Sequence, residues 1–594
     1  MKALVRTPVL LLSMARQGGR GRLAGSILLL LLGYLATPGI ALVLRRLTDA
    51  ALAGHAGTAG TLALGAVALL LAELMFGHFA HLLYFELGEL AEATLQEELL
   101  TLANGTHGLE NHDSPEFADT LVLVREDLPK TRSALEALLQ LGGLTVQTLI
   151  TTVILGTLNP WMALLPLAAV PPVVLGRRAQ DLVERAKERA APQIRLSRHL
   201  LTLATSAASV KELRLCGTET ELLERHRAGW DATTATLQRA HLRAAVLRAA
   251  GQTVFAAAYG GVILLILWQA VHGRAGLGDV VLVITLAVQV SVQVASALGL
   301  LTVLQGAGRI AERMADLRRW SAGMLRPGGE RPAPAVLREG IRFENVGFGY
   351  PGSGTKVLDG VDLFLPAGRT VALVGENGAG KSTMVKLLCG LYQPTEGRIL
   401  VDGVDLRDLS AEQWSRRIAP LFQDFARLEL LLRENVGVGA VASIEDDAVL
   451  TAALARAGAE RIVARVPGGL DGLLGRGYGD GAELSGGQWQ TLGLARCLVR
   501  PEPLLMLLDE PAAALDAAAE SNVFERFGDS AGRAARERGA VTLFVSHRFS
   551  TVRMADLIVV LENGRVLESG SHAELMANDL TYRELFDLQA RAYR

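Results

Sequence analysis

Long apolar runs separated by charged stretches fill the first half of the chain, and this pattern ends at about residue 320. A helix needs about 20 apolar residues to cross roughly 30 Å of hydrocarbon. The pattern predicts six membrane-spanning helices, at approximately 23–44, 60–84, 138–156, 161–176, 249–270 and 278–303. The fourth run is short, and Pro160 with the pair Pro171 and Pro172 predicts a bent helix there.

Lysine and arginine in the connections predict which way the spans face. The segment before the first span carries five of these residues, and 177–243 carries thirteen. The stretches 47–59 and 157–159 carry none. Because basic connections stay on the cytoplasmic side, we expect the N-terminus and both long connections to face the cytoplasm.

Two connections, 85–137 and 177–243, are too long and too rich in helix-forming residues for simple loops. We expect each to form two helices that extend the neighbouring spans away from the membrane. At their far ends we predict short coupling helices near 110–120 and 207–217.

Cap signals mark these far ends. Ser114 precedes a proline, which is typical of a helix start, and Ser209 with Glu212 matches a capping box. We expect the two tips to dock on a cytoplasmic domain, with Phe117 and Leu213 as contact residues.

The composition changes where the spans end. Residues 321–336 are rich in Pro, Gly and Ala, and from about 340 short β-type runs alternate with helices. We therefore predict a membrane α-helical domain over 1–320, a linker over 321–339 and a C-terminal α/β domain over 340–594. The net charge of −2 gives no reason to expect a nucleic-acid partner, which would need a basic face. The apolar runs make the lipid bilayer the expected partner of the first half.

The run TVALVGENGAGKSTMVKLL contains a strand, a glycine-rich turn and a helix start. This order, with the spacing G-x-x-x-x-G-K-[ST], is typical of a loop that holds nucleotide phosphates on backbone N–H groups. Lys381 is expected to reach the β- and γ-phosphates of ATP, and the Ser382 hydroxyl to bind Mg²⁺. The predicted ATP-binding loop comprises Gly375, Glu376, Asn377, Gly378, Ala379, Gly380, Lys381, Ser382 and Thr383.

A second chemical signal is the apolar strand LLMLLDEP, which ends in Asp509 and Glu510. A carboxylate at the end of a buried strand suits the metal side of a phosphoryl-transfer site. The next carboxylate suits a base that polarises the attacking water. We therefore assign Asp509 to the metal and Glu510 to catalysis.

In these motifs and in its order of segments, nearly the whole chain resembles ATP-binding-cassette half-transporters of the exporter type. The most specific motif is LSGGQ, which consists of Leu484, Ser485, Gly486, Gly487 and Gln488. The resemblance implies a P-loop nucleotide-binding domain that works in pairs. Each ATP site then uses the phosphate loop of one chain and the LSGGQ segment of the other.

The resemblance assigns further positions. Tyr350 resembles the aromatic residue that stacks on adenine, and Val357 is placed on the same ATP-binding surface. Gln423 resembles the glutamine that helps to hold Mg²⁺ together with Ser382 and Asp509. His547 resembles the histidine that contacts the γ-phosphate, and it is assigned to catalysis together with Glu510 and Gln423. Asp516 matches the acidic loop that crosses the dimer interface in the family.

The function implied by the resemblance is an ATP-driven exporter of a drug-like, peptide or lipid substrate in the bacterial inner membrane, with a cytoplasmic cassette. An importer built on the exporter fold and a cassette ATPase without a transport role are the alternatives. Because every catalytic position matches the active pattern, a homodimer is favoured over a heterodimer with a degenerate partner. Polar residues in the spans either bind cargo or satisfy one another between helices; they are Glu73, His78, His81, Gln252, Gln269, Gln289 and Gln293.

Overall fold

The computed structural model describes residues 2–105, 108–324, 329–475, 479–510, 517–546, 549–578 and 580–592. By its contacts the chain divides into two compact units. The membrane unit comprises 1–101 and 122–316, and the cassette unit comprises 102–121 and 317–594.

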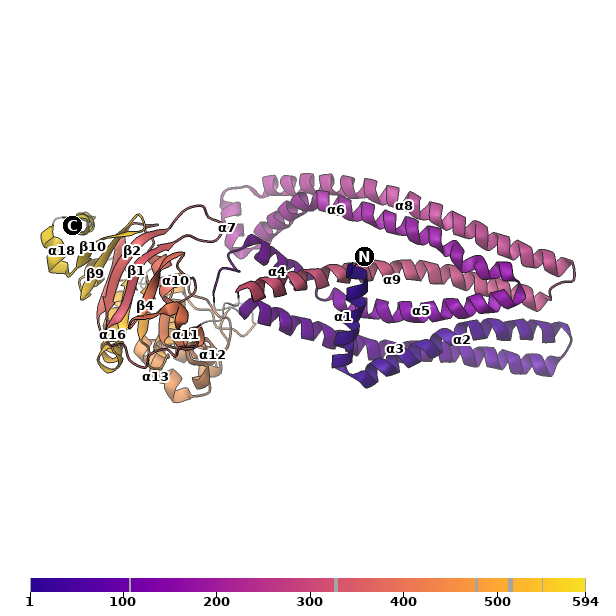
Figure 1. Cartoon of the computed structure of the whole chain (residues 1–594), viewed down its shortest axis with the longest axis horizontal. Coiled ribbons are helices and arrows are strands. Elements are labelled where there is room, and N and C mark those ends of the chain that lie inside the picture. Colours follow the sequence, from indigo (N-terminus) through magenta and orange to yellow (C-terminus); the bar gives the residue numbers. More distant parts are fainter. Residues whose placement is uncertain are drawn as a thin grey trace. The chain divides into compact units, whose positions relative to one another are not determined.

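The membrane unit is entirely helical in its described residues (Figure 1). Its elements are α1 (Lys2–Gly18), α2 (Arg20–Leu52), α3 (Ala56–Asn104), α5 (Lys130–Leu158), the 3-10 helix η1 (Pro160–Ala169), α6 (Val170–Thr205), α7 (Ala207–Leu215), α8 (Glu219–Val271) and α9 (Leu277–Met324). Among the described residues, six segments are long and apolar enough to cross a membrane, and each contains one predicted span. The long connections do extend the spans, as α3, α6 and α8 show by their length.

The fourth predicted span is not one regular α-helix, as its prolines predict. Asn159 caps its start by accepting a hydrogen bond from the Trp161 N–H at 2.9 Å, and Pro160 occupies the first position. The 3-10 helix η1 changes to the α-helix α6 at Val170, directly before Pro171 and Pro172. Proline lacks the N–H that an α-helix needs, so the bend follows from the sequence.

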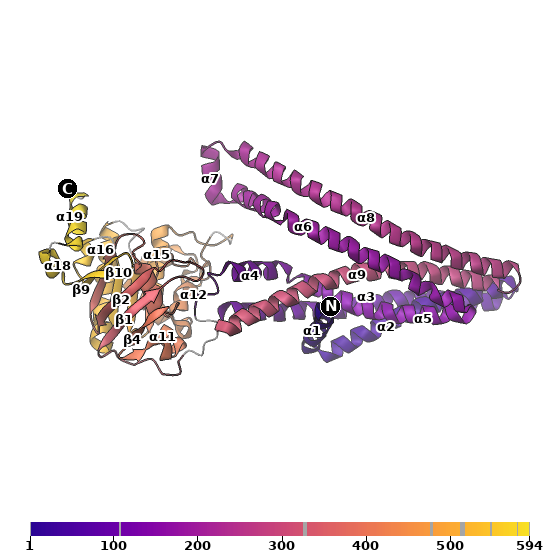
Figure 2. The same cartoon turned by 45° about the horizontal axis from the view of Figure 1, so that its top comes forward.

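Packing inside the membrane unit joins residues from most of its helices. One buried cluster contains Leu155 of α5, Met162 of η1, Phe255 of α8 and Leu286 of α9. Helices α6 and α8 lie side by side in both views (Figures 1 and 2). Many other apolar side chains of these helices are exposed, as expected for surfaces that face lipid.

Two of the polar residues in the spans form hydrogen bonds between helices. Glu73 of α3 accepts a hydrogen bond from Thr37 of α2 at 2.9 Å. Gln293 of α9 accepts one from Thr148 of α5 at 3.0 Å. For these residues the structure favours mutual satisfaction over cargo binding.

The cassette unit contains two sheets. Their strands are β1 (Gly340–Phe348), β2 (Leu358–Pro366), β3 (Thr370–Gly375), β4 (Glu396–Val401), β5 (Val404–Asp405), β6 (Ile418–Leu421), β7 (Leu505–Asp509), β8 (Val541–Val545), β9 (Leu557–Glu562) and β10 (Arg565–Gly570). The first sheet is antiparallel in the order β2-β1-β4-β5. The second has the order β10-β9-β3-β8-β7-β6 and is parallel except for β10.

Helices and short turns complete the cassette. They are α10 (Lys381–Leu388), η2 (Leu406–Asp408), α11 (Ala411–Arg416), α12 (Leu432–Gly437), η3 (Val438–Ser443), α13 (Asp447–Ala457), α14 (Glu460–Arg465), η4 (Gly469–Asp471), α15 (Gly486–Leu498), α16 (Ala517–Arg538), α17 (Phe549–Val552), α18 (His572–Asn578) and α19 (Thr581–Ala592). Buried aliphatic side chains cover both faces of the parallel sheet, including Leu508 on one face and Leu507 on the other. This burial explains why β7 and β8 are continuous apolar runs rather than alternating ones.

Three boundary predictions differ from the structure. Helix α9 continues to Met324, so the linker begins four residues later than position 321. Helix α7 begins at Ala207 after Ser206, which places Ser209 inside the helix and makes the predicted capping box wrong. Ser114 does precede α4 (Pro115–Asp127), but its hydroxyl donates to Glu116 at 3.4 Å instead of capping the helix.

Candidate active site

The parallel sheet brings three predicted site residues to one edge. Strands β3, β7 and β6 run parallel, and the loops after their carboxyl ends carry the phosphate loop, Glu510 and Gln423. Ligands bind at this edge of open α/β sheets because helices begin there and loops converge. The fold therefore brings together residues that the sequence analysis assigned to one ATP site.

The phosphate loop needs glycine at both ends. Gly375 has a φ of 150° and Gly380 has a φ of 101°. Residues with a Cβ atom rarely adopt such positive φ values. A Cβ on Gly375 would lie 2.2 Å from the Leu561 carbonyl oxygen. One on Gly380 would lie 2.6 Å from Cδ2 of Leu358. Between them the loop exposes Glu376, Asn377 and Gly378 and buries Ala379.

Lys381 is the first residue of α10, and its side chain reaches back to the start of the phosphate loop. Its Nζ donates to the carbonyl oxygens of Gly375 at 2.9 Å and Glu376 at 2.8 Å. Burial lowers its pKa, and the carboxylates of Glu510 and Asp509 oppose that shift. The loop carbonyls thus hold the ammonium group, which forms no ion pair with a carboxylate among the described residues. Its charge is therefore available to bind phosphate.

Asp509 ends β7 and is only 4% exposed. Burial raises its pKa, while a hydrogen bond from the Ser382 hydroxyl lowers it. Its Oδ1 has no hydrogen-bond partner among the described residues. A buried carboxylate oxygen without a donor beside a serine hydroxyl is the donor set that suits Mg²⁺, so these residues fit the expected ion.

Glu510 follows directly and turns the chain sharply. Its φ of 51° is in the left-handed region, which is unfavourable for a residue other than glycine. Its N–H donates to the Val545 carbonyl of β8 at 3.1 Å. Its Oε2 accepts a hydrogen bond from Nε2 of Gln423 at 2.8 Å. The strained turn thus directs the carboxylate toward the loop after β6.

Tyr350 adjoins the phosphate loop through its hydroxyl, which lies 3.1 Å from the Thr383 hydroxyl. Its ring contacts that of Tyr392 edge to face at 5.4 Å, and the Lys386 ammonium lies 5.6 Å from its centre. Val357 is close in sequence and donates to the Phe348 carbonyl at 2.7 Å. The ring of Tyr350, the residue predicted to stack on adenine, is therefore supported by a buried second tyrosine that sequence analysis missed.

Tyr392 also contacts the segment 102–121, which contains the first predicted coupling helix and belongs to the cassette unit. Its hydroxyl donates to Asp113, and the Leu109 N–H donates to the Leu391 carbonyl at 2.9 Å. Phe117, the contact residue predicted for this tip, is buried, and its ring lies against those of His112 and Trp320. The hydrogen bonds to residues 391 and 392 come from Leu109 and Asp113.

The LSGGQ segment forms the start of α15. Ser485 caps the helix by accepting from the Gln488 N–H at 3.3 Å, and the Gln488 side chain accepts from the Ser485 N–H at 2.8 Å. Leu484 is buried, whereas Ser485 and Gly486 are exposed. A Cβ on Gly486 would meet nothing within 4 Å. The helix start is an open anion-binding surface.

Two predicted site residues, Asp516 and His547, lie outside the described residues. The strand that leads to His547 is nevertheless placed. β8 pairs with β3 and β7 in parallel, so its carboxyl end reaches the same edge as Gly375 and Asp509.

The membrane unit contains a cavity of about 400 Å³ between α6, α8 and α9, with a mixed apolar and polar lining. Its polar lining comes from Arg177, Gln180, Arg248, Gln252, Thr302 and Gln305. Arg248 donates to the Gln180 side chain at 3.3 Å. Gln252, one of the residues singled out in the sequence, therefore opens on a cavity rather than on a neighbouring helix.

Comparison with known proteins identifies the cassette. Residues 358–513 match the ABC transporter family. The subtilin transport ATP-binding protein SpaT of Bacillus subtilis is 36% identical over 245 residues, which cover 41% of this chain and 39% of that protein. The ATP-dependent lipid A-core flippase of Ralstonia nicotianae is 41% identical over 253 residues, 42% of this chain and 41% of that protein. The matched regions thus span about two fifths of these relatives.

The fold of the whole chain is also found in a solved structure. A bacterial Atm1-family ABC exporter with ATP bound superposes with a TM-score of 0.82 at 25% identity. The match covers 96% of this chain and 98% of that one. The recognition of an ABC cassette and of the exporter fold from the sequence motifs is therefore confirmed.

Proposed function

We propose that this chain, which has an ABC cassette and the fold of an ABC exporter, is one half of an ATP-driven exporter. The observation that carries the proposal is the convergence of Lys381, Asp509 and Glu510 at one sheet edge of a chain with six candidate spans. Phosphoryl transfer to water at this edge supplies the free energy, and the helices supply the path.

In the proposed reaction Glu510 polarises the attacking water. The Gln423 amide holds its carboxylate at 2.8 Å, so the base is oriented before nucleotide binds. Lys381 binds the β- and γ-phosphates in place of the two carbonyls it now contacts. Ser382, Asp509 and Gln423 would hold Mg²⁺, which stabilises the developing charge on the phosphate oxygens when it is bound.

The proposal includes a second copy of the chain. The exposed Ser485 and Gly486 present a hydroxyl and the N-terminal end of α15 at the surface of their own cassette. In a pair of chains these donors bind the γ-phosphate of the ATP on the partner subunit. Because both halves of each site are intact here, we favour a homodimer.

The proposed cargo is an amphiphilic peptide, lipid or drug-like molecule. Relatives of the cassette are named for transport of subtilin and nisin, lipid A-core flipping and multidrug resistance. The cavity lined by Arg177, Arg248 and Gln252 offers positive charge and amide groups to such a molecule. We place the chain in a bacterial inner membrane, with its N-terminus and cassette in the cytoplasm.

Reconstitution in lipid vesicles tests the proposal. Wild-type protein with its cassette outward should hydrolyse ATP and move a fluorescent amphiphile into the lumen. Lys381→Ala should abolish both activities, and Gln252→Ala should reduce amphiphile stimulation while basal hydrolysis persists. Movement of the amphiphile out of the lumen would instead identify an importer, and hydrolysis without movement of any tested amphiphile would contradict the transport role.

A further inference from the structure

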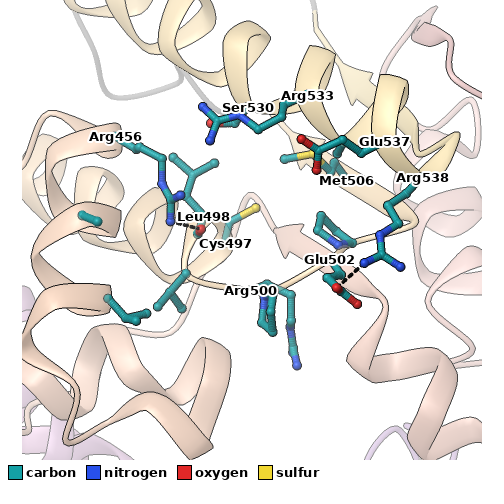
Figure 3. A pocket seen from close by; sticks show the side chains of 16 residues that line it. Arg456, Cys497, Leu498, Arg500, Glu502, Met506, Ser530, Arg533, Glu537 and Arg538 are labelled. Carbon is teal, nitrogen blue, oxygen red and sulfur yellow. Dashed lines mark hydrogen bonds and ion pairs between the residues drawn. The ribbon is translucent and has the colours of Figure 1, made fainter. Parts of the chain in front are cut away.

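The cassette contains a cavity of about 380 Å³ at the end of β7 opposite Asp509 (Figure 3). Its walls come from α13, the C-terminal end of α15, the segment 499–503, the start of β7 and α16. The phosphate loop and Tyr350 are not among its lining residues. It is therefore separate from the ATP site, and its volume is within the range of small-molecule sites.

Positive charge dominates the lining, which contains four arginines and two glutamates. Arg538 and Glu502 pair with each other, and Arg417 also pairs with Glu502 at 3.0 Å. Glu502 therefore offsets part of the positive charge at that end of the cavity. The charges that remain without an ion pair among the described residues are those of Arg456, Arg500, Arg533 and Glu537.

Arg456 and Arg533 are the two lining residues best suited to bind an anion. Arg456 donates from Nη2 to the Leu498 carbonyl at 2.9 Å, but its buried Nε has no partner among the described residues. Burial lowers the pKa of Arg456, and the positive charge of Arg533 lowers it further. Arginine stays protonated in proteins, so two like charges line the same cavity, and neither forms an ion pair with a described residue.

The close-up view agrees with this geometry. Ser530 and Arg533 lie together on α16, with Arg456 of α13 to one side of them and Glu537 of α16 to the other (Figure 3). The floor is apolar where Cys497 and Met506 line it. A guanidinium pair with an adjacent hydroxyl binds phosphate or carboxylate oxygens well, and an apolar floor favours a ligand with a hydrocarbon part.

We propose that this cavity binds a small organic anion, a phosphate monoester or a carboxylate with an apolar group, through Arg456 and Arg533. The anionic group accepts hydrogen bonds from both guanidinium groups and from Ser530, and the apolar group covers Cys497 and Met506. Glu537 faces the anion and weakens its binding.

Calorimetry on the full chain in lipid nanodiscs tests the site, with both ATP sites filled by a non-hydrolysable ATP analogue and Mg²⁺. Phenyl phosphate is the probe, phenol is its neutral match, and benzoate and inorganic phosphate separate the anion types. We expect saturable binding of phenyl phosphate and no binding of phenol. Tighter binding of benzoate than of phenyl phosphate would assign the same site to carboxylates.

Four variants make the test specific. Arg533→Gln and Arg456→Gln should each weaken phenyl phosphate by about tenfold or more, because each removes a charged donor. Arg536→Gln, on the same helix but outside the lining, should have no effect. Glu537→Gln should tighten binding several-fold. Absence of saturable binding, equal binding of phenol, or unchanged affinity in Arg533→Gln would overturn the proposal; since Arg533 is exposed, that variant does not threaten folding.

Discussion

At the scale of single residues, Glu510 combines an unfavourable backbone conformation with a hydrogen bond that orients its carboxylate. Its φ of 51° costs about 1 kcal/mol or more relative to a relaxed residue. Strain of this kind persists only when the surroundings enforce it, and here the Val545 carbonyl and the Gln423 amide do so. The geometry fits a base whose carboxylate must be aimed rather than merely present.

Glu510→Gln should therefore remove the base and keep the fold of the turn. We expect the kcat of ATP hydrolysis to fall by about 100-fold or more, the usual contribution of general base catalysis. ATP affinity should be unchanged, because the phosphate loop is intact. Steady-state phosphate release and equilibrium nucleotide binding measure the two quantities, and turnover near the wild-type rate would remove Glu510 as the base.

Tyr392 should control ATP affinity through Tyr350. Tyr392→Leu removes the ring that packs edge to face on Tyr350, a contact of about 0.5–1.5 kcal/mol. We expect the KM for ATP to rise roughly two- to tenfold with a smaller change in kcat.

The matched control is Tyr392→Phe, which keeps the ring and loses only the hydrogen bond to Asp113. Its KM for ATP should stay at the wild-type value. Equal KM values in the two variants would show that ring packing does not position Tyr350.

Most of the ATP site was predictable from local sequence, and the remainder was not. Gly375, Gly380 and Lys381 are recognisable because the loop geometry demands those residue types at that spacing. Tyr392 and Asp113 were missed because their contact joins residues 279 positions apart, and neither type is unusual where it stands. Phe117 was assigned by its position at the tip, whereas burial against Trp320 decides its role.

At the scale of helices and strands, apolar length and proline positions predicted the elements well, but capping signals did not. The six spans follow from runs of apolar residues that only a helix can hold in lipid. The Ser209 capping box failed because Ser206, three residues earlier, also suits a helix start and fits the end of α6 better. Such short polar patterns are common, so local sequence alone cannot choose between neighbouring starts.

A cap that the structure does define is Asp446 at the start of α13. Its Oδ1 accepts from the N–H groups of Ala448 and Val449, both at 3.1 Å. Asp446→Ala should destabilise this helix start by about 1 kcal/mol. The amides of the first turn of α13 should then exchange with solvent about five times faster in hydrogen-exchange mass spectrometry.

Asp446→Asn keeps an oxygen acceptor at the same place and serves as the control. It should exchange at nearly the wild-type rate, because Asn is as good a cap as Asp. Fast exchange in both variants would point to lost charge rather than to the lost cap.

At the scale of the whole molecule, the phosphate loop and the LSGGQ segment are both exposed at the surface of one cassette. Asn377 and Ser485 are both exposed, and the open surface at Gly486 has no contact in its own chain within 4 Å of an added Cβ. Helix capping explains the serine at this exposed helix start, but it does not explain the two glycines that follow it. A shared site between two chains explains both surfaces with one arrangement.

Cross-linking between differently tagged chains tests this arrangement. One chain carries Asn377→Cys and the other carries Ser485→Cys, both in a background without Cys216, Cys389 and Cys497 and with Glu510→Gln to retain ATP. A short bifunctional maleimide should join the two tags when ATP and Mg²⁺ are present and should join few chains without nucleotide. A single chain with both cysteines, diluted with cysteine-free chains, should form no internal link. An internal link in that diluted sample, or linking of the two tags that ignores ATP, would place the signature in its own cassette's site and remove the reason for a pair.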